Sequence, residues 1–377
     1  MLNQVYLIVA FSIAVHACYI GSKVVVSLYA LQLGASQITI GVLAALYAAV
    51  PLLIGVYSGR LADTRGTHWP LIGGAAVMCL GMLASVFASG VGALVVTAVL
   101  AGAGFMFFNV SIQTLTGALG TADQRARNFA ILSIGYSIST FIGPVSVGLA
   151  IDTFGYRGAF TMLALFTVPP IAGLLLTRRF DFIGGKKPAD ETSRSALELL
   201  RLPAVRSVVI ISGLIVAASD LFAFYLPLYG HSLNYSATLI GILLGVYAFA
   251  GIITRFAMPA LLRRWREERV MFACLLFAAV AFAVFPLSGH LYFMLAATFC
   301  LGLGLGCGQP LSMMIAFNRS PEGRAGEVTG LRLSANNLAR VVIPVVCGVL
   351  GASMGAAPVF WLNAINLTAV SFVVWRQ

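Results

Sequence analysis

Charged side chains are scarce in this sequence, and three of them interrupt long apolar segments. Lys23, Asp220 and Arg340 each lie well inside such a segment. Burying a charge in hydrocarbon costs at least a few kcal/mol unless the group faces protein or water, so these residues are the first candidates for a functional site. Asp220 is the only acidic residue well inside an apolar segment. It is therefore the natural proton carrier if the protein moves protons, and a structural ion pair with Lys23 is the alternative.

Arg340 stands at the end of a polar stripe whose members recur every fourth residue. Arg332, Asn336 and Arg340 share one slanting face of a helix at this spacing. The planar guanidinium of Arg340 suits a carboxylate or a phosphate, and Asn336 would orient either the solute or the guanidinium. An internal ion pair of Arg340 with Asp220 or Glu327 is the alternative. Arg332 lies nearer the end of the segment, so its side chain could either stay inside the membrane or reach the membrane surface.

Three amides and one tyrosine add hydrogen-bonding groups to other apolar segments. Asn109, Gln113 and Gln309 offer donors and acceptors, as expected around a solute site, although buried amides also bridge helices. Tyr136 would contribute a wall that is partly apolar and partly polar, and plain packing is the alternative. With Asp220 as the proton-coupling residue, we predict a solute site formed by Lys23, Asn109, Gln113, Tyr136, Gln309, Asn336 and Arg340.

The elements that must position these residues are membrane-spanning helices. The chain has 377 residues, of which 60% are hydrophobic and 9% charged, whereas about a quarter of the residues in a soluble domain are charged. A span takes about 20 apolar residues, so the length suits twelve spans. We predict an all-α integral membrane protein with spans near 5–32, 39–59, 70–89, 91–118, 129–152, 157–177, 206–230, 237–262, 269–288, 290–317, 327–351 and 356–375.

The distribution of basic residues predicts the orientation of these spans. Most Lys and Arg residues lie in or beside connections on one side of the membrane, and the opposite side holds only Arg157. Basic loops stay in the cytoplasm, so both termini are expected there, in the plasma membrane (inner membrane) of a bacterial-type cell. This asymmetry accounts for the net charge of +11 without a nucleic-acid partner.

Several classes of chemistry find no support in the sequence. The six cysteines all lie within apolar segments, and no Cys or His pair has metal-ligand spacing. No Gly-x-x-x-x-Gly-Lys-Ser/Thr stretch is present, so ATP is not expected to be the direct energy source. No nucleophile and base stand at recognisable spacing. We therefore expect no metal, no cofactor and no enzymatic activity.

The sequence repeats itself at a constant offset of 200 residues. The matching pairs include Tyr29 and Tyr229, Ser36 and Ser236, Gly102 and Gly302, Pro144 and Pro344, and Gly155 and Gly355. One register without gaps predicts two homologous six-helix halves, residues 1–177 and 206–377, joined by a cytoplasmic linker at 178–205. The halves are parallel because six is an even number, and a solute path is expected between them.

The loop after the second span carries the most specific motif. The segment GRLADTRG at residues 59–66 resembles the Gly-x-x-x-Asp-Arg-x-Gly signature of the major facilitator superfamily. A second similarity, to the region between the fifth and sixth helices of efflux members, covers Gly143, Pro144, Gly148 and Asp152. Together with the spans, the linker and the repeat, the resemblance covers the whole chain. It implies transport by alternating access.

The resemblance also implies a conformational latch. In this family the loop signature holds the two halves together on the cytoplasmic side when the cavity faces outward, and its gating residues here are Gly59, Asp63, Arg65 and Gly66. Glycine permits a tight turn, and the Asp63 carboxylate can accept N–H groups at a helix start and pair with Arg125 or Arg127. A solvated turn that only sets the topology is the alternative.

These observations predict a secondary active transporter. The resemblance favours proton-coupled efflux of a small organic solute by antiport, and three intramembrane cations against one central acid favour a solute with negative charge. The alternatives are a proton-symporting importer of an organic anion and a transporter-like membrane sensor. The expected partners are the solute, protons and membrane lipids, and the chain is expected to act as a monomer.

Overall fold

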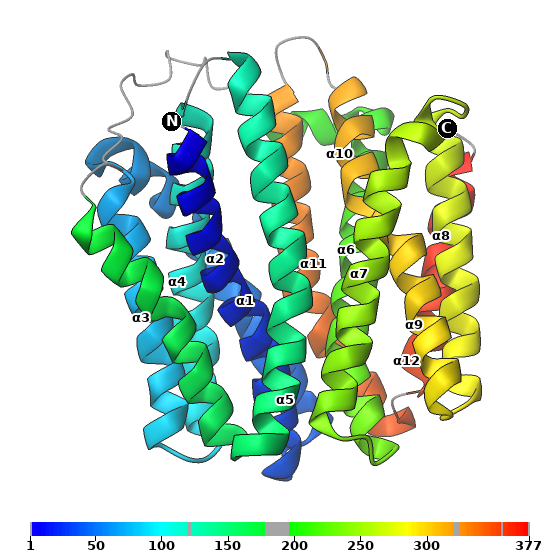
Figure 1. The fold of residues 1–377 in the computed structure, drawn as a ribbon. Helices are drawn as coiled ribbons and strands as arrows, with labels where there is room; N and C mark the ends of the chain where they lie inside the picture. Colours follow the sequence, from blue (N-terminus) through cyan, green and yellow to red (C-terminus); the bar gives the residue numbers. More distant parts are fainter. Residues whose placement is uncertain are drawn as a thin grey trace. The chain divides into compact units, whose positions relative to one another are not determined.

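The protein is described by a computed structural model that covers residues 2–119, 122–177, 196–319, 321, 325–355 and 357–375. Every regular element in this part of the chain is helical (Figure 1). Ten of the described segments are long and apolar enough to cross a membrane. The prediction of an all-α, multi-pass membrane protein is thus confirmed. The number of spans stays a prediction, since one apolar segment, Ile131–Leu176, has 46 residues, about twice what one span needs.

The first of two compact units comprises Met1–Lys187 together with Gly230–Gly245. Its helices are α1 (Leu2–Gln32), α2 (Gln37–Arg65), α3 (His68–Phe87), α4 (Val91–Ala118) and α5 (Ala122–Leu176). Inside this unit α1 packs along α5, and α4 packs against α1, α2, α3 and α5 (Figure 1). The helices that carry Lys23, Asn109 and Tyr136 are therefore neighbours.

Helix α5 contains both segments that the sequence predicts as separate spans at 129–152 and 157–177. Gly155 interrupts it with φ 69° and ψ −178°, a conformation that glycine adopts without the steric penalty of a Cβ atom. The two helical stretches on either side of Gly155 are consequently joined by a sharp bend rather than by a loop.

The second unit comprises Pro188–Tyr229 and Val246–Gln377. Its elements are η2 (Ala196–Arg201), α6 (Pro203–Ser232), α7 (Ala237–Leu262), α8 (Glu267–Val284), η3 (Phe285–Leu287), α9 (Leu291–Gly306), α10 (Gly308–Asn318), α11 (Ala325–Met354) and α12 (Ala357–Trp375). The last residues of α6 and the first residues of α7 belong to the first unit. Within the second unit α8 packs against α9 and α12, and α11 contacts α10 and α12.

Two predicted segments differ in detail from the observed elements. The span expected at 290–317 is divided at Cys307 into α9 and α10. Of the linker expected at 178–205, residues 178–195 lie outside the described part of the chain, and Ala196–Arg201 form the 3₁₀-helix η2.

The offset of 200 residues recurs in the local backbone geometry. The Ser36 hydroxyl accepts a hydrogen bond from the backbone N–H three residues later at 3.2 Å, and the Ser236 hydroxyl does the same at 3.2 Å. Both serines therefore cap a helix start. Each follows a residue with positive φ, which is Gly34 in one copy and Asn234 in the other. Helices α2 and α7 thus begin with the same turn.

The outer surface of the helices is apolar, as a lipid environment requires. Large side chains such as Leu53, Phe87 and Leu176 are more than four-fifths exposed, at 82%, 82% and 86%. The interior is close-packed, and a Cβ atom placed on Gly104 of α4 would lie 2.5 Å from the carbonyl oxygen of Gly74 in α3. Small residues let two membrane helices approach to backbone contact in this way.

Candidate functional site

An ion pair between two long helices is the most conspicuous polar feature of the second unit. Asp220 lies in α6 and Arg340 in α11, and the Arg340 Nε donates to the Asp220 Oδ2 at 2.6 Å. The side chains remain partly open, with 32% of Asp220 and 41% of Arg340 exposed. A charge-assisted hydrogen bond of this length is strong. The structure thus shows Arg340 as the partner of Asp220, which is the internal pair that the sequence analysis kept as an alternative.

Lys23 lies in α1 of the first unit and contacts aromatic rings. Its Nζ is 4.6 Å from the centre of the Tyr19 ring and 5.8 Å from that of Tyr47. The Tyr19 ring stacks on Phe105 of α4, with ring centres 3.9 Å apart. The negative face of an aromatic ring attracts a cation. Lys23 is therefore held on an aromatic surface in the described part of the chain, while Asp220 has Arg340 as its partner.

The predicted amides and tyrosine of the first unit form one hydrogen-bonded group. The Tyr136 hydroxyl of α5 donates to the Asn109 Oδ1 of α4 at 2.7 Å. The Gln113 Nε2, one turn further along α4, donates to the same oxygen at 3.2 Å. The His16 ring of α1 lies 4.8 Å from the Tyr136 ring and forms a hydrogen bond with Ser139. The structure thus brings Asn109, Gln113 and Tyr136 together as predicted site residues.

A polar cluster around Arg332 contains the remaining predicted residues, Gln309 and Asn336. The Arg332 Nη1 donates to the Ser212 hydroxyl at 3.1 Å, and to the Gln309 Oε1 and the Ser312 hydroxyl at 3.4 Å each. The Ser212 hydroxyl donates in turn to the Asn336 Oδ1 at 3.0 Å. The cluster connects α6, α10 and α11 within the second unit.

The burial of Arg332 decides between two positions that the sequence left open. Only 5% of the residue is exposed, so its side chain does not reach the membrane surface. The spacing of four residues to Asn336 was the signal that both side chains share one face of α11. That face packs against α6 and α10, which supply the hydroxyls and the amide that bind the guanidinium.

Asp152, which the sequence analysis placed in the segment similar to efflux members of the superfamily, caps a helix of the structure. Its carboxylate accepts hydrogen bonds from the backbone N–H groups of Ala237 at 3.2 Å and Thr238 at 2.7 Å. These are the first two residues of α7, so the carboxylate caps that helix and faces the positive end of its dipole. All three residues belong to the first unit.

The predicted latch can be followed only in its backbone. Helix α2 ends at Arg65, and Gly66 after it has φ 86°, so the tight turn expected at this glycine is present. The structure does not describe the side chains of Asp63 and Arg65, nor those of their possible partners Arg125 and Arg127. Of Gly59 it describes only that the residue belongs to α2. The latch therefore stays a prediction.

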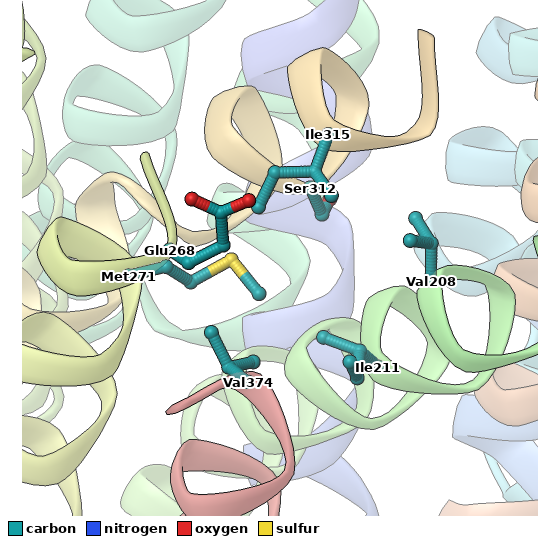
Figure 2. A pocket seen from close by; sticks show the side chains of 7 residues that line it. All are labelled: Val208, Ile211, Glu268, Met271, Ser312, Ile315 and Val374. Carbon is teal, nitrogen blue, oxygen red and sulfur yellow. The ribbon is translucent and has the colours of Figure 1, made fainter. Parts of the chain in front are cut away.

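A narrow pocket, too tight to hold a water molecule, lies within the second unit. Figure 2 shows that the Ser312 and Ile315 side chains line it from α10, with Met271 and Glu268 on α8. Its wall consists of Val208, Ile211, Glu268, Met271, Ser312, Ile315 and Val374. Apart from Ser312 and Glu268 it is apolar, and Ser312 also contacts Arg332. The pocket therefore borders the Arg332 cluster.

Ion pairs and hydrogen-bonded amides between apolar helices, as described above, are found in the interiors of membrane transporters. Residues 6–344 match the Major Facilitator Superfamily, and the chain belongs to that family. This confirms the family that the loop motif predicted.

Individual relatives agree with the family. The uncharacterized MFS-type transporter YuxJ of Bacillus subtilis (strain 168) is 21% identical over 330 residues, which are 86% of this chain and 84% of that protein. The class H tetracycline resistance protein of Pasteurella multocida is 22% identical over 331 residues, which are 81% of this chain and 78% of that protein. The crystal structure of the peptide transporter POT in complex with sulfate has a TM-score of 0.83 at 16% identity and covers 99% of this chain and 93% of that one.

Proposed function

We propose that this membrane transporter works as a proton-coupled secondary carrier that exports a small organic solute. The ion pair between Asp220 and Arg340 carries the proposal, since it joins a titratable acid to a solute-binding cation on two different helices. The name of the tetracycline resistance relative supports efflux as the direction. Lys23, Asn109, Gln113, Tyr136, Gln309, Asn336 and Arg340 are the proposed solute-binding residues.

The ion pair supplies a physical basis for coupling. The Asp220 carboxylate binds the Arg340 guanidinium strongly only while it is unprotonated. Protonation removes the negative charge that attracts the guanidinium and weakens the ion pair. A change at Asp220 therefore changes what α11 is bonded to. Two helices that gain or lose a strong contact in this way form an element with two states, which alternating access needs.

The direction of coupling depends on which member of the pair the solute meets. A solute that donates a hydrogen bond or carries a cation competes with the proton for Asp220, and this competition produces antiport. A solute that binds through an anionic group to Arg340 is instead helped by protonation of Asp220, because the guanidinium is then free. The observed pair therefore also favours a second candidate function, symport of an organic anion with a proton.

The proposed architecture completes this mechanism. Twelve spans in two parallel six-helix repeats, residues 1–177 and 206–377, would place Asp220 and Lys23 on equivalent helices of the two repeats. Both termini would face the cytoplasm of a bacterial-type inner membrane. The loop motif at residues 59–66 would latch the cytoplasmic side, and the protein would act as a monomer.

Transport driven by a pH gradient tests the proposal. The purified full chain in lipid vesicles is given a panel of small carboxylates and lipophilic cations, and wild type is compared with Asp220→Asn. Glu198→Gln is the matched control, because Glu198 is an exposed acid of η2 away from the spans. We expect gradient-dependent transport that Asp220→Asn abolishes and Glu198→Gln preserves. Unchanged transport in Asp220→Asn would remove Asp220 from the proton pathway.

The pH dependence of solute affinity separates the two candidate functions. For antiport, affinity at equilibrium rises as the pH rises, because the proton leaves the group that the solute needs. For anion symport, affinity falls as the pH rises, because Asp220 recaptures Arg340. The sign of this dependence, measured without a gradient, decides between export by proton exchange and import with a proton.

A further inference from the structure

The Arg332 guanidinium is buried with part of its hydrogen-bonding capacity unused. Its Nε lies in the protein interior with no hydrogen-bond partner, and so does the Nε2 of Gln309. The two side chains are in contact, since the Arg332 Nη1 donates to the Gln309 Oε1 at 3.4 Å. Two unpaired N–H donors on adjacent helices, α10 and α11, therefore stand in one cluster. Buried polar groups are normally paired, so such donors indicate a missing acceptor.

The charge of Arg332 is also uncompensated within the described residues. Its three bonded neighbours are the hydroxyls of Ser212 and Ser312 and the amide oxygen of Gln309, all of which are neutral. The ion pairs found in this part of the chain join other arginines, namely Arg266 and Arg319 with Glu268, and Arg340 with Asp220. A buried guanidinium without an anion is costly, because neutral partners satisfy its N–H groups but not its charge.

One acidic residue on the same helix is spaced unfavourably for pairing. Glu327 lies five residues before Arg332, whereas side chains that meet on a helix surface are three or four residues apart. A water molecule in the cluster would satisfy the free N–H groups, yet it would leave the positive charge in place. An anion, in contrast, would satisfy both the free N–H groups and the charge.

We propose that Arg332 and Gln309 form a binding site for the carboxylate group of the transported solute. The two oxygens of a carboxylate match the two unpaired donors, and an arginine side chain holds such a group through planar paired hydrogen bonds. This inference rests on the proposed function, since it takes the bound carboxylate to belong to the transported solute. It assigns the anionic end of that solute to Arg332 rather than to Arg340. Arg340 then serves the proton-coupled ion pair.

Substitution of Gln309 by Glu tests the missing charge without any ligand. Gln309→Glu places a carboxylate beside Arg332 with almost no change in size. We expect the thermal midpoint of the purified full chain to rise by roughly 2–4 °C, because the buried cation gains its counter-charge. A lower midpoint would show that Arg332 is already neutralised and would overturn the proposal. Glu327→Gln is the control. If it lowers the thermal midpoint as strongly as Arg332→Gln does, Glu327 is the existing counter-ion of Arg332, and the proposal is overturned.

Anion binding tests the site directly. The wild-type chain in zwitterionic detergent is titrated at constant ionic strength with acetate, benzoate, succinate and phosphate against chloride. We expect at least one carboxylate to raise the thermal midpoint in a saturable way by roughly 3–5 °C. Gln309→Glu is expected to abolish this rise, since its own carboxylate occupies the site. The Asp220→Asn/Arg340→Gln double variant, which lacks the cation of the other ion pair, is expected to keep the rise.

The outcomes separate this inference from the proposed function. No saturable rise with any carboxylate, or a rise with phosphate alone, overturns the carboxylate site. A rise that the Asp220→Asn/Arg340→Gln double variant abolishes places the anion at Arg340 and overturns the inference as well. A carboxylate response that survives in this double variant supports the site at Arg332, even if the vesicle assay finds no proton-driven transport and the proposed coupling fails.

Discussion

Replacing Asp220 with Asn removes the negative charge that lies 2.6 Å from the Arg340 guanidinium. The guanidinium then faces a neutral amide in a site that is partly closed to solvent. With 32% of the Asp220 side chain and 41% of the Arg340 side chain exposed, the pair lies between two measured regimes. Exposed pairs contribute up to about 1 kcal/mol, and breaking a fully buried pair costs about 3–5 kcal/mol.

Because both side chains of this pair are partly exposed, we expect an interaction energy closer to that of exposed pairs than to that of buried pairs. We expect a coupling free energy between Asp220 and Arg340 of about 1–2 kcal/mol. For a chain of this length that energy corresponds to a fall of roughly 1–3 °C in the thermal midpoint of Asp220→Asn. The loss arises from the uncompensated Arg340 charge, so it should be smaller when that charge is removed too.

A double-mutant cycle measures the coupling. Thermal unfolding of the purified protein is followed for wild type, Asp220→Asn, Arg340→Gln and the double variant. We expect the double variant to lose less stability than the sum of the single variants. Glu198→Gln, which neutralises an exposed acid outside the spans, should stay within about 0.5 kcal/mol of wild type. Additivity of the two single variants to within about 0.3 kcal/mol would refute the reasoning, because independent sites add to that degree.

Three further substitutions test other parts of the structure. Asp152→Ala should lower the free energy of unfolding by about 1–2 kcal/mol, since it removes the cap of α7, and Asp152→Asn should restore most of it in the same thermal assay. Gly104→Val should cut the yield of monodisperse protein in size-exclusion chromatography, because the new side chain meets the α3 backbone. The matched control Gly92→Val, which has open space around it, should leave the yield unchanged. Tyr136→Phe removes the 2.7 Å hydrogen bond to Asn109. It should raise the KM for solute by about 5-fold at unchanged kcat. An unaltered KM would place Tyr136 outside the solute site.

Properties that depend on segments of the chain were accessible from the sequence. The helical class, the membrane environment and the approximate bounds of most spans follow from runs of apolar residues, which are read locally. The repeat and the loop motif at 59–66 led to the superfamily that the match over residues 6–344 confirms. Local geometry also followed, as in the tight turn at Gly66, which has a positive φ. The halves, the number of spans and the solute-binding roles remain predictions.

Partnerships between distant residues were decided by the tertiary structure. Asp220 and Arg340 are 120 positions apart, and so are Ser212 and Arg332. The sequence named Asp220 as a possible partner of Arg340 but could not choose it over Glu327. It also left open whether the Arg332 side chain reaches the membrane surface, whereas only 5% of the residue is exposed in the structure.

The physical reason is the same in each case. Hydropathy records whether a segment prefers lipid, but it does not record which face of one helix meets which face of another. Arg332 is buried because α6 and α10 cover its side of α11 and supply polar atoms at hydrogen-bonding distance. The sequence by itself therefore determined that this is a helical membrane transporter of a known superfamily, and only the packing of its helices decided which charge meets which partner and which charge is left without one.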